Sequence, residues 1–226
     1  MANRKPIELD EWYHCYNRGV DKRRVFLNRS DYERFLLLLF TANASVPAHI
    51  FHLENKHLQT VLSDISLNRG NAIVEIGAYS LMPNHVHLVL KEIQEHGISL
   101  FMQKVFTGYT MYFNEKNERT GSLFAGTFKS KHIASDDYLK QLIPYVHLNC
   151  VEIFDPKWKT GQGSGAAIHE RLEKYPYSSL PDFLGTKRPE RKLLGDSIFE
   201  LFDRLPNTRE MLEDSKEYYI SLSTEV

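Results

Sequence analysis

The feature that most restricts the fold of this chain is the apolar run MPNHVHLVL at positions 82–90, which carries two histidines. Its β-branched and leucine residues favour a strand, and side chains two residues apart in a strand point to the same face. His85 and His87 therefore project together, while Val86 and Leu88 project to the other face. Two neutral imidazoles side by side supply half of a divalent-metal site. Two ordinary strand histidines would give the same pattern, so the pattern alone leaves both interpretations open.

The remaining periodicity predicts an α+β fold built on a small antiparallel sheet. Pro83-Asn84 is a turn sequence that joins a strand over 72–79 to the histidine strand as a hairpin. Ser30 is the expected N-cap of the first long helix, with Glu33 completing a capping box. Together the elements follow the order β-α-β-β-α-β of a ferredoxin-like sheet with helices on one face. The other expected elements are a strand over 12–16, a helix over 98–117, a strand over 127–133, and a helix from an N-cap at Ser135 to about Asn149.

We expect one main domain over residues 1–153, followed by a linker and a C-terminal helical extension over 154–226. Residues 45–70 show no clear period, which indicates an insertion or a mobile loop within the main domain. Residues 161–167 are rich in glycine and alanine and are typical of a flexible link. Residues 175–179, with the sequence YPYSS, look like an extended segment docked on the rest of the chain.

The charge is spread unevenly along the chain. The formal net charge is −1, whereas a nucleic-acid-binding domain usually shows a basic footprint. Residues 195–226 hold eight acidic and three basic side chains, so the remainder has 25 basic against 21 acidic residues and a net charge of +4. A mildly basic body with an acidic tail permits nucleic-acid binding without requiring it.

The cysteine content and the hydropathy favour a cytoplasmic protein with no membrane segment. Cys15 and Cys150 are the two cysteines, and neither belongs to a C-x-x-C pair. Two free thiols in a reducing compartment are a simpler interpretation than one disulfide. The chain contains no run of about 18 apolar residues, and its N-terminus lacks the apolar centre of a secretory signal.

The predicted helix after Asp136 carries a second candidate group, the phenol of Tyr145. Tyr145 and Asn149 are four residues apart and therefore share one face of the helix. A phenol beside a metal-polarised phosphate is a plausible nucleophile, and an amide oxygen one turn later can complete the ligand set of a hard cation. An amphipathic tyrosine of the core or surface would fit the same pattern. The rival tyrosines are Tyr109 and Tyr112, in a helix stripe typical of a core, and Tyr138, in the first helical turn.

The histidine run resembles the signature of the HUH single-tyrosine transposases, in which two histidines flank one hydrophobic residue. The similarity covers residues 12–153 and 172–185, and the subgroup most resembled is the insertion-sequence and REP-associated type that works on single-stranded DNA. Besides the histidine run, the matching blocks are Tyr13 with Asn17-Arg18-Gly19, residues 31–35, 109–114, 121–130 and 138–149, and residues 175–185.

The resemblance implies that residues 1–153 form a catalytic domain that cleaves and rejoins single-stranded DNA, at element ends that contain a hairpin. His85 and His87 would hold Mg²⁺ or Mn²⁺ with Asn149 as the third protein ligand. Tyr145 would attack the scissile phosphate, which gives a 5′-phosphotyrosine link and a free 3′-hydroxyl. A second 3′-hydroxyl then reverses the step. Relatives include monomers and homodimers that exchange the tyrosine helix, and the sequence leaves the two open.

Two other functions remain open at this point. One is a domesticated protein that binds hairpin nucleic acid without strand transfer, and the other is a metal-dependent phosphodiesterase that uses water.

The chain also departs from the family pattern at three places. Cys150 stands where proline is frequent, Thr127 stands where arginine is frequent, and residues 45–70 are longer than expected. Without the proline we expect the helical conformation to continue beyond Asn149.

Two sets of basic residues are candidates for phosphate contacts, with solvated surface charge as the alternative interpretation. Phosphate contacts are made mainly by basic side chains and position the nucleic acid. The first set lies on the last predicted strand and the second on the first loop: Lys129, Lys131 and His132, and Arg18, Arg23 and Arg24.

Overall fold

The computed structural model describes residues 6–46, 58–64, 69–158, 168–202 and 207–214. This part of the chain forms four strands, β1 (Trp12–Arg18), β2 (Val74–Met82), β3 (His85–Glu92) and β4 (Lys129–Ile133). Neighbouring strands are antiparallel, and their order in the sheet is β2-β3-β1-β4. The predicted ferredoxin-like sheet is confirmed. The hairpin between β2 and β3 is also confirmed, although β2 begins and ends later than predicted.

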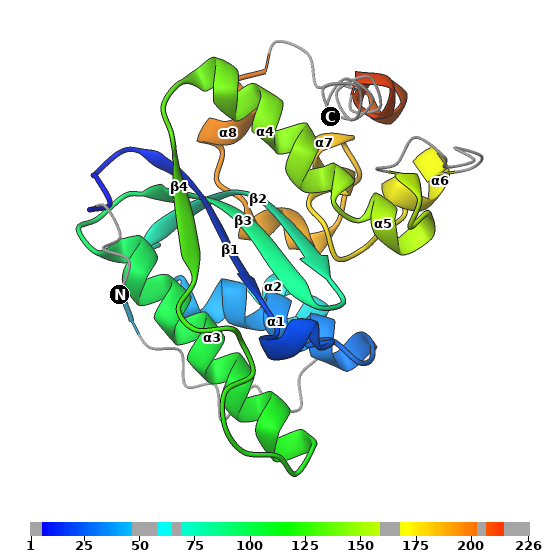
Figure 1. Ribbon diagram of the computed structural model, residues 1–226. Coiled ribbons are helices and arrows are strands. Elements are labelled where there is room, and N and C mark those ends of the chain that lie inside the picture. The colour runs from blue at the N-terminus through cyan, green and yellow to red at the C-terminus, as the bar shows by residue number, and fades with distance from the viewer. Residues whose placement is uncertain (1–5, 47–57, 65–68, 159–167, 203–206, 215–226) are drawn as a thin grey trace.

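Helices cover both faces of this sheet. The crossover helices α1 (Arg29–Ala42) and α3 (Gly97–Lys116) lie on one face, as predicted. The helix that follows the last strand, α4 (Asp136–Leu148), packs against β2, β3 and β4 and lies across the opposite face (Figure 1). The sheet is therefore a layer between the crossover helices and α4.

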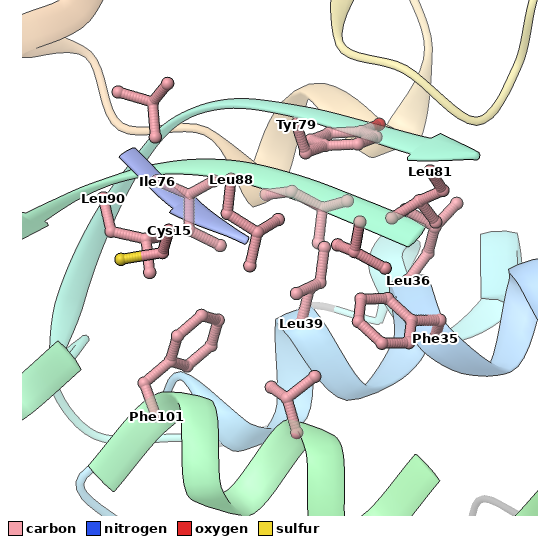
Figure 2. Packing of buried hydrophobic residues seen from close by; sticks show 14 of the residues in the cluster. Cys15, Phe35, Leu36, Leu39, Ile76, Tyr79, Leu81, Leu88, Leu90 and Phe101 are labelled. Atoms are coloured by element: carbon pink, nitrogen blue, oxygen red, sulfur yellow. The ribbon is translucent and has the colours of Figure 1, made fainter. Parts of the chain in front are cut away.

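The apolar side chains of the central strands determine which face the histidines occupy. Figure 2 shows Cys15 and Leu88 of the sheet facing Phe101 of α3 and Leu39 of α1, and all four are buried. Fully burying an apolar side chain of this size stabilises the fold by about 1.5–3 kcal/mol. Because strand side chains alternate, this burial places the histidines of β3 on the face covered by α4.

The start of α1 differs from the prediction, because its N-cap is Asn28 and not Ser30. The side chain of Asn28 accepts the backbone N–H of Asp31, and the Asp31 carboxylate accepts the backbone N–H of Asn28. The Asp31 side chain is completely buried and lies 2.6 Å from the Lys116 ammonium. The helix therefore begins at a local capping box two residues before Ser30, and the ion pair with the end of α3 is a further, tertiary contact of the same carboxylate.

The chain after α4 folds back onto the sheet. Residues 177–179 run along the outer edge of β2, where the backbone N–H of Leu81 donates to Tyr177 and that of Ser179 donates to Tyr79. The predicted docked segment is thus present, whereas the division at residue 153 stays a prediction. The elements of this region are α5 (Val151–Phe154), α6 (Ile168–Glu173), α7 (Leu180–Phe183), the 3-10 helix η4 (Pro189–Leu193) and α8 (Ser197–Glu200).

Three smaller expectations concern the insertion, the cysteines and the membrane. Part of the expected insertion forms α2 (Leu58–Ser63), whose apolar side chains are buried, while residues 47–57 and 65–68 lie outside the described residues. Cys15 and Cys150 are both buried and form no disulfide. Among the described helices, none has the length and apolar character needed to cross a bilayer.

Candidate active site

Helix α4 brings the Tyr145 ring to the sheet face that carries the histidines. This ring lies edge-on to His87 and to His14 of β1, with centroids 6.4 Å and 6.3 Å apart and interplanar angles of 87° and 84°. The rings of His85 and His87 have centroids 5.0 Å apart. Tyr145 is 39% exposed, whereas His87 is 8% exposed. The predicted imidazole pair and the predicted phenol therefore meet within one chain.

Both predicted metal-ligating histidines are oriented by a hydrogen bond at Nδ1. His85 Nδ1 lies 2.6 Å from Asn84 Oδ1, and His87 Nδ1 lies 2.9 Å from His14 Nε2. An amide oxygen can only accept, so the neutral His85 ring would carry its proton on Nδ1 and a lone pair on Nε2. Histidines that bind metals typically make such a bond through their other nitrogen.

Two aromatic residues at this face were not found from the sequence, His14 and Tyr16 of β1. His14 is 7% exposed, and burial together with the positive charge of Lys131 lowers its pKa to about 4. The Tyr16 ring lies parallel to that of His87 within 24°, with centroids 6.0 Å apart. The spacing of the two residues in β1 predicts a shared face, but only the pairing of β1 with β3 places them beside His87.

Asn149, the predicted third ligand, ends α4 one turn after Tyr145. Its amide nitrogen donates to the carbonyl oxygen of Tyr145 at 2.9 Å, so Oδ1 is the atom of this amide that could bind a cation. The residue is 4% exposed and has helical dihedral angles. Asn149 and Cys150 keep helical dihedral angles, but α4 itself ends at Leu148 and Cys150 is the N-cap of the separate helix α5.

The rival tyrosines are placed differently from Tyr145. The Tyr109 hydroxyl is buried and donates to the carbonyl oxygen of Val25, and burial raises its pKa. The Tyr112 hydroxyl donates to Asp31 at the start of α1. The Tyr138 ring lies under the Lys131 ammonium, 5.2 Å from the ring centroid. Tyr145 of α4 and Tyr16 of β1 have their rings against His87, whereas Tyr138 lies beside Lys131 on the same side of the sheet.

The structure separates the three basic residues predicted on the last strand. Lys129 lies opposite Tyr16 and Lys131 opposite His14, so both lie on the face of the sheet that holds the histidines. His132 lies opposite Tyr13 and therefore on the other face, where its Nε2 is 2.9 Å from Glu11. The prediction of His132 as a phosphate contact beside this site is corrected on that ground.

The basic residues of the first loop lie near the turn that precedes His85. Arg18 is exposed and lies opposite His85 in the sheet. The loop that follows is bound to this turn by backbone hydrogen bonds from Gly19 to Asn84 and from Val25 to Pro83. Arg23 and Arg24 are exposed on this loop. Arg23 also lies 3.7 Å from Asp21.

The C-terminal region fixes the position of the tyrosine helix. The completely buried ring of His147 in α4 lies 2.8 Å, through Nε2, from the Ser179 hydroxyl. Ser179 also accepts the backbone N–H of Tyr79 in β2. Burial and the positive charge of Arg188 lower the pKa of His147 to about 3, so this ring is neutral. Through these contacts the helix that carries Tyr145 is joined to the sheet of its own chain.

The donor atoms at this face suit a divalent cation. In the described ranges, no three His, Cys, Asp or Glu side chains form a group that could hold a metal ion. A cation here would instead need the two imidazoles of His85 and His87 with an amide or ligand oxygen. Imidazole nitrogen and amide oxygen both bind divalent cations such as Mn²⁺, and the hydrogen bonds at Nδ1 orient the rings for such binding.

Comparison with known proteins gives a match to one family model and a similar fold. Residues 47–149 match the family model described as "Transposase IS200 like". The structure is similar to that described as "Structure of the REP associates tyrosine transposase bound to a REP hairpin", with a TM-score of 0.51 and 11% sequence identity over 84% of this chain and 90% of that chain. At this identity the likeness concerns the fold. No curated protein sequence matches the chain.

Proposed function

Because residues 47–149 match the IS200-like transposase family model, we propose that the chain cleaves and rejoins single-stranded DNA with Tyr145 as the nucleophile. The observation that carries this proposal is the position of the exposed Tyr145 ring, edge-on to the buried ring of His87 in the same chain. A phenol and a pair of imidazoles on one face supply a nucleophile and cation ligands at one phosphate.

The reaction exchanges one phosphodiester for another. The Tyr145 Oη loses its proton to solvent and attacks the scissile phosphorus, and the bond from phosphorus to the 3′-oxygen breaks. The 3′-oxygen leaves with the electron pair of that bond and takes up a proton. The 5′-phosphate is then esterified to Tyr145. The attack of a second 3′-hydroxyl on this phosphotyrosine rejoins the DNA and restores the phenol, so no external energy source is needed.

His85, His87 and Asn149 are the residues that would hold Mg²⁺ or Mn²⁺, which supplies charge stabilisation at the phosphoryl oxygens. The chain itself positions these groups. The Asn84 amide hydrogen-bonds the His85 ring, and Tyr145 and Asn149, four residues apart at the end of α4, would approach the phosphate from one side. The DNA backbone would lie along the face that carries Lys129, Lys131 and Arg18, with Arg23 and Arg24 on the adjoining loop.

The proposed substrate is a single strand that contains a hairpin. The structural neighbour is described as bound to a REP hairpin, and the basic residues on the histidine face of this chain would provide phosphate contacts beside Tyr145. We propose that the tyrosine acts on DNA held by its own subunit, because α4 is joined to its own sheet through His147 and Ser179.

Incubation with a hairpin-containing single-stranded oligonucleotide and Mg²⁺ tests the proposed function. We expect a protein–DNA adduct that survives denaturation and an oligonucleotide fragment with a free 3′-hydroxyl, both detected on denaturing gels. Binding without cleavage for a panel of such oligonucleotides would favour the hairpin-binding alternative. Metal-dependent cleavage without an adduct would favour the phosphodiesterase.

The basic residues on β4 give a prediction about DNA affinity. We expect the double substitution Lys129→Ala and Lys131→Ala to weaken binding of single-stranded DNA. Each lost phosphate contact should also lower the slope of log K against log salt by about 0.7. Fluorescence anisotropy at several salt concentrations measures both effects. The matched control is His132→Ala on the same strand but on the opposite face. An equal effect of this control would contradict the assignment of the DNA to the histidine face.

A further inference from the structure

We propose that His14 is a positioning residue that sets the tautomer and ring orientation of His87, an inference that rests on the proposed function of His87 as a metal ligand. The role of His14 does not depend on contact with the cation or with the DNA. It acts through one hydrogen bond between two imidazoles on adjacent strands, β1 and β3.

The geometry of the two rings is that of a direct hydrogen bond. His14 Nε2 and His87 Nδ1 are 2.9 Å apart. The ring centroids are 5.1 Å apart and the planes differ by 17°. The distance between the centroids is close to the length of the hydrogen bond plus the radius of each ring. The two rings therefore meet edge to edge and lie in nearly one plane. Such an arrangement gives a nearly linear N–H···N bond.

Two neutral imidazoles joined in this way share one proton, and its position decides what His87 can bind. If His87 Nδ1–H donates to His14 Nε2, then His87 Nε2 carries the lone pair that a cation needs. If His14 donates instead, the proton of the neutral His87 ring lies on Nε2, and that nitrogen cannot be a ligand. A metal-ligating His87 therefore requires His14 as the acceptor.

The surroundings of His14 hold its ring in the orientation that this bond needs. The ring is buried between neighbours that fix its plane, with Tyr16 at a centroid distance of 5.2 Å and Tyr145 edge-on at 6.3 Å. His14 thus does for His87 what the Asn84 amide oxygen does for His85, so that both rings present Nε2 as the ligand atom.

Long-range ¹H–¹⁵N correlation spectra of the wild-type protein without metal test the tautomer directly. We expect the ¹⁵N shifts of His87 to show a proton on Nδ1, with the signals assigned by their loss in His87→Gln. A His87 ring protonated on Nε2 would overturn the proposal. This measurement needs no substitution at His14, so it applies even if variants at that position fold poorly.

Mn²⁺ binding, followed by the electron paramagnetic resonance signal of the free ion, tests the consequence without DNA or catalysis. We expect His14→Phe, which keeps an aromatic ring but has no acceptor, to weaken Mn²⁺ binding by about 10- to 100-fold. His14→Gln can place an amide oxygen near the position of Nε2 and should recover most of the affinity. Thermal unfolding of each variant verifies that it is folded.

His85→Ala separates failure of this inference from failure of the proposed function. One outcome is that the wild type binds Mn²⁺ and His85→Ala does not, which supports the metal site. If a folded His14→Phe then binds Mn²⁺ as tightly as the wild type, the positioning role of His14 is wrong. If the wild type and His85→Ala bind equally weakly, the proposed metal site is wrong and the inference fails with it. Weak binding by His14→Gln as well as His14→Phe would also overturn the role of His14 as acceptor.

Discussion

Substitution of Tyr145 by phenylalanine is expected to abolish the covalent protein–DNA adduct. The variant lacks the oxygen that forms the phosphotyrosine bond, while its ring can still lie edge-on to His14 and His87. Cleavage should fall by on the order of 10⁴-fold or more, as is typical when a nucleophile is removed. Binding of the same oligonucleotide should be unchanged, because no described hydrogen bond of the fold depends on the Tyr145 hydroxyl. Denaturing gels and anisotropy measure the two properties.

Tyr16→Phe is the matched control, because Tyr16 is the other phenol close to His87. We expect this variant to form the adduct at a level comparable with that of the wild type. Loss of the adduct in Tyr16→Phe with retention in Tyr145→Phe would reverse the assignment of the nucleophile. Water would be supported as the nucleophile by a different result. In that case Tyr145→Phe still cleaves the DNA, and no adduct forms in the wild type or in either variant.

A mixture of Tyr145→Phe and His85→Ala tests whether the tyrosine acts within its own subunit. Each variant retains the group that the other lacks, so a site shared between two subunits would regain activity in the mixture. We expect no adduct in the mixture, because Tyr145 and His87 approach each other within one chain. Recovery of the adduct would show exchange of the tyrosine helix between subunits.

His85→Ala is expected to remove metal-dependent cleavage and adduct formation together. A cation at a phosphoryl group supplies several kcal/mol of charge stabilisation, so the rate should fall by on the order of a thousandfold. The His85 side chain is only partly buried and hydrogen-bonds to the neighbouring Asn84, so its removal should leave the core unchanged. Single-turnover cleavage across a Mg²⁺ titration measures the effect.

His132→Ala serves as the control for His85→Ala, because His132 lies on a neighbouring part of the same sheet but on the opposite face. It should cleave DNA at the wild-type rate with the same Mg²⁺ dependence. If His85→Ala keeps the wild-type rate and the wild-type Mg²⁺ dependence, the assignment of His85 as a ligand is wrong. A similar loss in both variants would indicate damage to the sheet and not to a metal site.

The sequence predicted a helix or strand correctly where side-chain alternation or an N-cap determines that element. The alternation around His85 and His87 predicted a strand, and the sequence starting at Ser135 predicted a helix whose N-cap accepts the backbone N–H of Tyr138. The prediction of Ser30 as the first N-cap was wrong, because Asn28 and Asp31 form a capping box two residues earlier. The Asp31 carboxylate also pairs with Lys116, a residue far away in the sequence.

The candidate site was predictable in part. The spacing of His85 and His87 and the position of Tyr145 on a helix could be obtained from periodicity, and the family resemblance connected them. His14 could not be found in this way, because its relevance depends on β1 lying beside β3. The separation of His132 from Lys129 and Lys131 follows from the alternation of the predicted strand over 127–133 and could have been found from the sequence. The pairing of β4 with β1 decides which of the two sets lies on the histidine face.

The sequence by itself determined which residues alternate along each strand and which share a helix face, because these periodicities follow from backbone geometry alone. The tertiary structure decided which elements meet. Burial of the apolar strand faces against α1 and α3 turned the histidines toward α4, and the contacts of His147 with Ser179 hold the tyrosine helix over them. Apolar burial has no direction of its own, so the meeting of His14, His87 and Tyr145 depends on how the whole sheet pairs and packs.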